Sequence, residues 1–174
     1  MLDEETFTQY YEEYFPLIFR YVSRRIADRA EAEDLVSTVF LKAIEQRESF
    51  DEEKGSFKTW VYRIATNTMI DFFRKNAKNS HTALGDELIE TVPSQEKSAN
   101  RLTDEHLEKD HIHDVIGTLS ERYQEALLLR YFSDSSIEEM TKILNISPNN
   151  TSVLLNRAHA AFMQSYTRLT PHDT

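Results

Sequence analysis

The chain has 174 residues, of which 40% are hydrophobic, and it carries a formal net charge of −10 with no cysteine. Three glycines and four prolines supply too little turn chemistry for an all-β fold, and the lack of cysteine excludes disulfides and cysteine-ligated zinc. No apolar run approaches the roughly 18 residues of a membrane span, and the acidic first residues do not resemble a secretory signal. We therefore expect a cytoplasmic protein with an all-α fold.

The negative charge is concentrated in the middle of the sequence. Residues 81–115 contain nine acidic and three basic side chains, whereas acids and bases are closer to balance on either side. Because proteins bind duplex DNA largely through lysine and arginine, nonspecific DNA binding by the whole molecule is not expected. Any nucleic-acid site has to be a local face.

The first block, residues 1–78, is predicted to be a small helical domain. Hydrophobic and aromatic residues recur at three- and four-residue spacing over 3–26, the pattern of an amphipathic helix, and Pro16 either kinks this helix or begins a second one. Asp28 is a suitable N-cap and predicts a further helix over about 30–47.

A third helix is expected to follow a polar loop, beginning after Ser56 and ending near Lys75. When its residues are placed every 100° around the axis, an apolar side separates from an opposite side that carries Arg63, Asn67 and Arg74. Two cations can hold phosphates and an amide can pair with a base edge. This stripe is a candidate DNA-binding surface, and the alternative interpretation is an ordinary solvated helix face.

Aromatic and polar side chains flank the stripe. Tyr62 and Thr66 lie beside it, and Trp60 lies on the apolar side, where it is expected mainly as core. Proteins that bind single-stranded DNA combine cations with aromatic stacking surfaces in this way. We therefore include all three with the stripe as candidate contacts to an unpaired strand.

The helix predicted over 30–47 has a second face of interest. Asp34, Thr38, Leu41 and Glu45 share the side opposite its apolar arc. An exposed leucine among acids can mark a docking surface for a partner, although single exposed leucines are common on proteins.

The rest of the chain is predicted to be an acidic, flexible linker over 79–110 and a second small helical domain over 111–174. Helices are expected over 110–119, 120–132, 136–144 and from Pro148 to about Leu169. The short break between the last two has the spacing of a helix-turn-helix.

Neither a metal site nor an enzyme is expected. His106, His111 and His113 do not share a helical face at ligand spacing. The sequence contains no phosphate loop, nucleophile elbow or dinucleotide fingerprint, so no cofactor is expected either.

Several segments resemble extracytoplasmic-function (group 4) RNA polymerase sigma factors. Similarity to their domain 2 is carried by AEAEDL (30–35), VFLKA (39–43), SFD (49–51), GSFKTWVYRIATN (55–67) and ID (70–71). Similarity to their domain 4 is carried by LSERYQEALLLRYF (119–132), IEEM (137–140) and IL (143–144).

The resemblance implies an alternative sigma factor that binds core RNA polymerase and directs it to promoter DNA. The helix over 30–47 would dock on the clamp helices of the β′ subunit through Asp34, Leu41 and Glu45, with Thr38 on the same face. The segment 50–74 would melt the −10 element and hold its non-template strand. Asn67 would then lie beside a flipped-out base, with Arg63 and Arg74 on phosphates.

Two stretches depart from the family pattern. The usual Gln-Glu of the docking helix is Ser37-Thr38, which removes one acidic contact. The final helix has NTSVL (150–154) where the family has a Thr-Val-Lys-Ser-Arg-like run that reads the −35 element. Candidate residues there, for −35 DNA or for a protein such as the polymerase β flap, are Asn149, Asn150, Ser152, Leu154 and Arg157. With so few cations, strong independent −35 recognition is not expected.

Three alternatives remain open. Another DNA-binding protein could recruit the polymerase complex to its promoter. The chain could instead be a sigma-factor mimic that binds an anti-sigma factor without promoting transcription, an interpretation that its acidity favours and the stripe opposes. A plain helix-turn-helix repressor would leave the first 75 residues unexplained.

Overall fold

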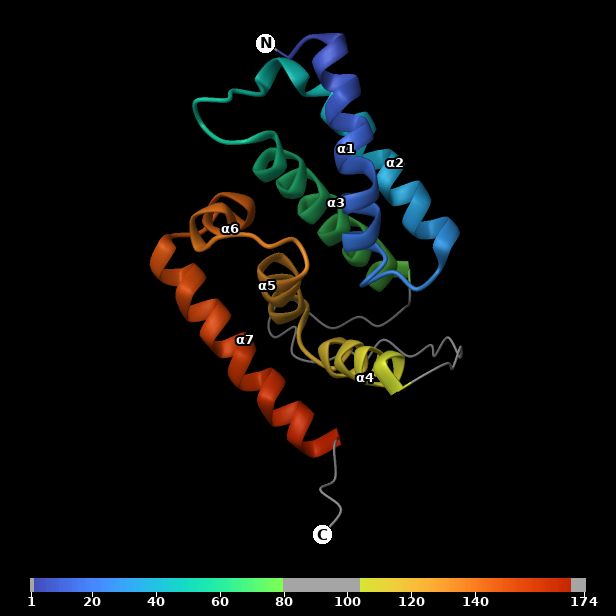
Figure 1. Cartoon of the computed structure of the whole chain (residues 1–174), viewed down its shortest axis with the longest axis vertical. Coiled ribbons are helices and arrows are strands. Elements are labelled where there is room, and N and C mark those ends of the chain that lie inside the picture. Colours follow the sequence, from blue (N-terminus) through green and yellow to red (C-terminus); the bar gives the residue numbers. More distant parts are fainter. Residues whose placement is uncertain (1, 80–103, 170–174) are drawn as a thin grey trace.

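The computed structural model describes residues 2–79 and 104–169, and every regular element in these two ranges is a helix, which confirms the all-α expectation. The elements along the chain are α1 (Glu4–Val22), α2 (Arg29–Glu45), the short 3-10 helix η1 (Arg47–Ser49), α3 (Phe57–Asn79), α4 (Asp104–Gly117), α5 (Glu121–Tyr131), α6 (Ile137–Leu144) and α7 (Pro148–Leu169). They form two groups, α1–α3 and α4–α7, which lie against each other (Figure 1). None of these helices is both long and apolar enough to cross a bilayer.

Polar side chains start the first three helices where the sequence predicts. The carboxylate of Asp28 accepts a hydrogen bond from the backbone N–H of Glu31 (2.9 Å) at the start of α2. The Ser56 hydroxyl accepts one from the Thr59 N–H (3.3 Å) at the start of α3. Pro16 lies inside α1, which continues past it as one helix, so the alternative of a second helix beginning at Pro16 is wrong.

The core of the first group is formed where α1, α2 and α3 meet. Fully buried aliphatic side chains come from each helix, including Ile18, Val36, Val39 and Val61. Burying a side chain of this size contributes about 1.5–3 kcal/mol each. Two expectations for this core are wrong in detail. Ile44, expected inside, is 41% exposed, and Phe72 is only partly buried, because both lie at the edge of their apolar arcs.

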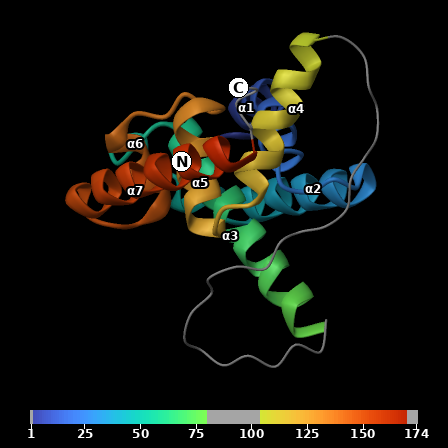
Figure 2. The same cartoon turned by 90° about the horizontal axis from the view of Figure 1, so that it is seen from below.

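In the second group, α6 and α7 form the expected helix-turn-helix. Ser136 and Glu139 make a reciprocal capping box at the start of α6, and Asn145 ends the helix in the left-handed conformation (φ 52°). Pro148 then opens α7, where a missing N–H costs nothing. The long α7 packs along α5, α4 and α6 (Figure 2).

Most of the expected linker, 80–103, lies outside the described residues. Its last residues differ from expectation, since α4 already begins at Asp104 rather than near 110.

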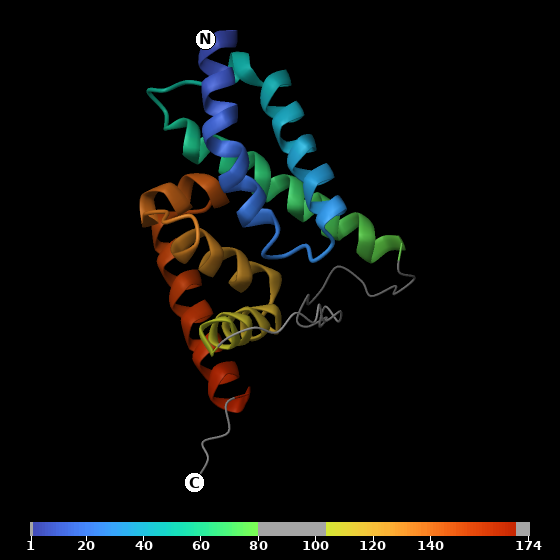
Figure 3. The same ribbon diagram turned by 45° about the vertical axis from the view of Figure 1, so that its right-hand side comes forward.

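The two groups share a packing surface. Helix α3 lies across α6, and α5 approaches α3 and the end of α1, with α7 on the far side (Figure 3). The buried hydrophobic residues of both groups form one continuous cluster. Helix α3 therefore has one side against α1 and α2 and a second side against the other group, which leaves only a narrow strip for solvent.

Candidate functional site

The outward strip of α3 carries the residues that the sequence analysis selected. Arg63, Asn67 and Arg74 are all exposed, and Ile70 between them is 47% exposed. Within the described ranges, no hydrogen bond or ion pair engages Arg63 or Asn67. These two side chains lie about one helical turn apart on the same face and are free to bind a ligand.

Arg74 differs, because it already has a partner. Its Nη2 donates to Asp71 Oδ1 at 2.8 Å. The other carboxylate oxygen of Asp71 lies 4.0 Å from Lys42 Nζ, which donates to Thr68 Oγ1 at 3.1 Å and so connects α2 to α3. An incoming phosphate must compete with Asp71 for Arg74.

The flanking residues Trp60, Tyr62 and Thr66 are buried, with exposed fractions of 7%, 3% and 1%. The expectation that Tyr62 and Thr66 lie at the surface beside the stripe differs from this structure, because their side of α3 faces the second helical group. Trp60 packs against Phe50 and Phe57, with ring centroids 5.2 and 5.4 Å away. Burial raises the pKa of the Tyr62 phenol to about 12. None of the three can touch DNA in this arrangement.

A buried polar network covers Thr66. Its Oγ1 donates to Glu125 Oε1 on α5 at 3.1 Å, and Tyr21 OH lies 3.1 Å from the same hydroxyl. Arg25 Nη1 donates to Glu125 Oε2 at 2.6 Å, and its guanidinium lies 4.5 Å from the centroid of the Phe73 ring. The Arg25 and Glu125 side chains are only 3% and 5% exposed.

Neither charge of this pair is comfortable alone. Burial raises the pKa of the Glu125 carboxyl to about 8 and lowers the pKa of Arg25 to about 10, whereas the close opposite charge favours the ionised form of each. Sequence reasoning missed both residues. A signal was present, because Glu125 directly precedes the apolar run 126–129 and belongs to the buried side of α5.

The second candidate surface is the outer face of α2. Asp34, Thr38, Leu41 and Glu45 are all exposed, Leu41 to 61%, and the misplaced Ile44 adds to the apolar part of this face. The Thr38 hydroxyl donates to the Asp34 carbonyl at 2.9 Å, so it satisfies its own helix rather than reaching outward. The result is an apolar spot flanked by carboxylates.

On α7, Asn149, Asn150, Ser152 and Arg157 are exposed as expected. Leu154 is half-buried against the core, so it is mainly a packing residue. The Ser152 hydroxyl donates back to the Pro148 carbonyl at 3.1 Å.

The sequence analysis passed over two further exposed residues of α7, Val153 and Asn156. Because they are spaced to share a face with Ser152 and Arg157, the outward face of α7 is polar and apolar with a single cation.

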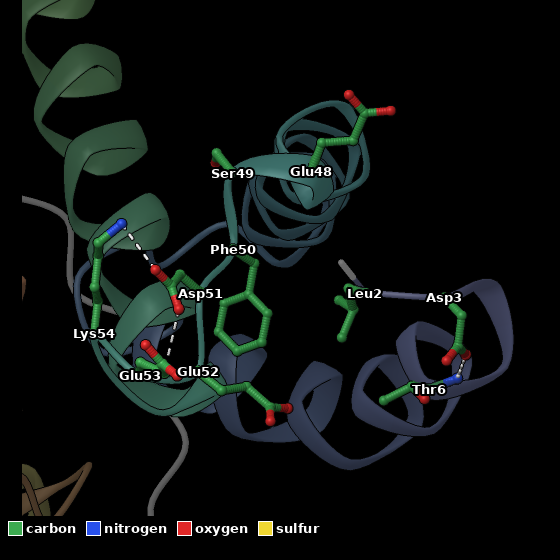
Figure 4. Close-up of a pocket in the computed structure, with 10 residues that line it drawn as sticks. All are labelled: Leu2, Asp3, Thr6, Glu48, Ser49, Phe50, Asp51, Glu52, Glu53 and Lys54. Carbon is green, nitrogen blue, oxygen red and sulfur yellow. Dashed lines mark hydrogen bonds and ion pairs between the residues drawn. The ribbon is translucent and has the colours of Figure 1, made fainter.

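A hollow of ≈ 670 Å³ lies where the N-terminal residues meet the loop before α3 (Figure 4). Leu2 and Phe50 supply its apolar surface, and the rest is mainly acidic, with Lys54 paired to Asp51 at 2.8 Å. Carboxylates at this site repel phosphates, so a nucleic-acid strand could place only an uncharged base here. In the described ranges, no group of His, Asp or Glu is arranged to hold a metal ion.

Comparison with known proteins identifies the architecture. The sigma-70 region 2 family matches residues 10–79, and the sigma-70 region 4 family matches residues 109–161. The ECF RNA polymerase sigma factor SigW of Bacillus subtilis is 30% identical over 91% of this chain and 88% of its own length. The RNA polymerase sigma factor YlaC of the same organism is 29% identical over 95% of this chain and 92% of its own length.

Solved structures agree on the fold. The sigma factor RpoE of Bartonella quintana, crystallised with the anti-sigma factor NepR, superposes with a TM-score of 0.68 at 20% identity, covering 91% of this chain and 95% of that one. CnrH, in complex with the cytosolic domain of CnrY, gives a TM-score of 0.66 at 19% identity, covering 93% and 88%.

A region 2 bundle followed by a region 4 helix-turn-helix defines a sigma factor, a regulator that acts in transcription initiation and not an enzyme. The chain belongs to the extracytoplasmic-function (group 4) sigma factors of RNA polymerase. Helices α1–α3 are its region 2, and α4–α7 are its region 4.

The pairing of Arg74 with Asp71 generates a testable prediction. Asp71→Asn releases Arg74 and removes a negative charge from the strip, so the polymerase–sigma complex should bind a single-stranded −10 oligonucleotide a few-fold more tightly at low salt. The salt slope should steepen by about 0.7, the value for one added phosphate contact on a single strand. Fluorescence anisotropy at several salt concentrations measures both.

The matched control is Glu33→Gln, which also neutralises a carboxylate paired with an arginine, Arg29, but on the outer side of α2. It should leave the salt slope unchanged. Equal slopes for Asp71→Asn and wild type would show that Arg74 does not contact the strand.

Proposed function

We propose that the α3 strip of this sigma factor holds the non-template strand of the −10 element while the promoter opens. The observation that carries this is the state of Arg63 and Asn67, which are exposed, neighbouring and unengaged within the described ranges on a helix that is otherwise buried on two sides. A rigidly anchored helix keeps such side chains in a fixed geometry. An amide can then pair with a base that has left the stack, and a guanidinium can hold the adjacent phosphate.

We further propose that the outer face of α2 docks on the clamp helices of the polymerase β′ subunit. Leu41 is among the most exposed hydrophobic side chains of the described ranges, and Asp34 and Glu45 lie on the same face. An apolar anchor surrounded by charges suits a partner surface with a complementary pocket and basic rim. The family's additional acidic residue is replaced here by Thr38, whose hydroxyl is turned to its own helix, so one ionic contact is missing.

Region 4 is proposed to read −35 DNA weakly. Asn149, Asn150 and Ser152 can bond base edges, but Arg157 is the one cation on the outward face of α7 in the described ranges. Phosphate contacts supply a large share of DNA affinity, so this face binds DNA with little electrostatic support. The exposed Val153 supports a second candidate role, in which region 4 binds the polymerase β flap or another DNA-binding protein that recruits the complex.

An anti-sigma factor is a further proposed partner. RpoE of Bartonella quintana and CnrH, which share this fold, were each solved in a complex, RpoE with an anti-sigma factor and CnrH with CnrY. The alternative that this chain is only a mimic, which binds an anti-sigma factor without promoting transcription, is less favoured. A mimic has no use for an exposed Arg63 and Asn67 on one face.

Asn67→Ala should impair promoter opening while leaving polymerase binding unchanged, because it removes the amide that pairs with the flipped base. We expect open-complex formation to fall by roughly 5–150-fold, the equivalent of a lost base contact worth about 1–3 kcal/mol. Permanganate footprinting of the −10 region measures opening, and co-purification measures binding. Gln9→Ala, which removes an exposed amide from α1, is the control. Undiminished opening by Asn67→Ala would remove Asn67 from the site.

Leu41→Arg should weaken association with core polymerase at least tenfold, since it replaces the apolar anchor of the docking face with a charge that must be desolvated. The dissociation constant can be measured by titrating labelled sigma with core enzyme. Leu169→Arg introduces the same change at another exposed leucine, on α7, and should have little effect. Equal affinities of Leu41→Arg and wild type would rule out this face of α2 as the docking surface.

Substitutions in the −35 element should change run-off transcription less than substitutions in the −10 element. A base pair that is read directly costs about 1–3 kcal/mol when changed, or roughly 5–150-fold, and we expect less than about fivefold at −35. Transcription by purified core polymerase and this chain from a promoter library with both elements varied tests this. A −35 dependence as steep as that at −10 would show that α7 reads DNA without a recruiter.

A further inference from the structure

The contact between regions 2 and 4 contains specific polar interactions as well as hydrophobic packing. Arg25 and Thr66 of region 2 both donate to the Glu125 carboxylate of region 4. Closer to the N-terminal end of α3, Lys58 donates to the Asp134 carbonyl at 3.1 Å and lies 3.5 Å from Glu139. Along this side of α3 the contact runs for several turns, and it ends where Phe73 meets Arg25.

More contacts occur beyond the end of α1. The Arg24 guanidinium lies 4.6 Å from the centroid of the Phe132 ring, and the Arg24 carbonyl is 2.8 Å from His113 Nε2. These residues are 24–25 on one side and 113–132 on the other, so the contact joins segments far apart in the chain.

The Arg25–Glu125 pair is the part of this surface that cannot tolerate loss of one member. Both side chains are almost fully buried, and Arg25 Nε has no hydrogen-bond partner within the described ranges. A buried ion pair adds little stability over apolar groups of the same shape, but removing one partner leaves an uncompensated charge in a dry site and is strongly unfavourable. When the two regions separate, water can solvate both groups.

Promoter geometry makes the closed arrangement inconsistent with binding both DNA elements. The −10 and −35 elements are about 25 base pairs apart, or roughly 85 Å along the duplex at about 3.4 Å per base pair. A compact chain of this length has a radius of gyration of about 16 Å and a diameter of roughly 40 Å. Residues 80–103 connect the regions, and a chain of that length spans up to about 80 Å when extended. Simultaneous binding therefore requires regions 2 and 4 to move apart.

We propose that Arg25, Glu125, Thr66 and Tyr21 form an intramolecular latch that holds regions 2 and 4 in a closed, inactive arrangement, and that polymerase binding opens it. The inference that the closed form is inactive rests on the proposed promoter contacts, whereas the latch itself rests on the interface geometry. Closure also buries Tyr62 and Thr66, which the family resemblance assigns to the strand-binding surface. A ligand that binds only the open form shifts the equilibrium toward it, and latch strength sets the affinity that is lost.

The latch can be tested by measuring the distance between the regions directly. The chain has no cysteine, so Glu12→Cys on α1 and Gln164→Cys on α7 introduce two exposed sites for spin labels without interference. The otherwise wild-type chain should give one short distance. Arg25→Met and Glu125→Leu, each alone, should lower the ratio of closed to open molecules at least tenfold and broaden the distribution to longer distances.

The combination Arg25→Met with Glu125→Leu is the decisive variant. It removes both charges and replaces them with apolar groups, so the closed distance should return even though two residues have changed. A purely structural role would give additive damage instead. Glu138→Leu, which breaks the exposed Glu138–Lys142 pair within α6, is the control and should stay closed. Circular dichroism checks that each variant is folded; should Glu125→Leu lose helicity, Arg25→Met, which leaves region 4 unchanged, decides.

Polymerase provides the second readout. Core enzyme should move the wild-type chain to long distances, and the two single variants should bind core enzyme several-fold more tightly because they no longer lose affinity to closure. Single variants that keep the short distance while folded would overturn the latch. The distance measurement needs no promoter, so it can succeed even if transcription fails, and failure of the latch leaves the transcription assays of region 2 unaffected.

Discussion

The surfaces of this protein depend on how α3 is packed. One side of the helix meets α1 and α2 in the region 2 core, and another side lies against α5 and α6 of region 4. Two buried sides leave one strip, and it carries Arg63 and Asn67. Anchoring on both sides gives the strip a fixed geometry. It also means that any ligand that needs more of α3 has to displace region 4 first.

Charge placement explains how a chain with a net charge of −10 can be directed at DNA. Its arginines and lysines are positioned individually rather than spread as a basic field. Arg74 is held by Asp71, Arg25 by Glu125 and Lys58 by Glu139, so that Arg63 and Arg157 are among the few cations left unpaired in the described ranges. Nonspecific attraction to DNA is correspondingly weak. Specificity therefore has to come from partners and from the local geometry of the strip, which fits a subunit that acts only as part of a larger enzyme.

The buried network between the regions and the candidate binding strip are two faces of the same helix. Thr66 follows Arg63 by three residues and precedes Asn67 by one, yet it points to Glu125 while they point to solvent. A change in the position of region 4 thus alters the surroundings of the strip without altering α3 itself. Such coupling needs no long pathway, because the two surfaces are separated only by the width of a helix.

The amino-acid sequence by itself determined the helices, their caps, the helix-turn-helix and the outward direction of Arg63, Asn67, Leu41 and Arg157. All of these follow from local periodicity and capping chemistry, which act over a few residues. Only the tertiary structure decided the fate of Tyr62, Thr66, Arg25 and Glu125. Periodicity shows that a side chain leaves the apolar arc of its own helix, but it does not show what a segment 60 to 100 residues away brings against it. The Arg25–Glu125 pair joins positions 100 residues apart, and no local pattern connects them.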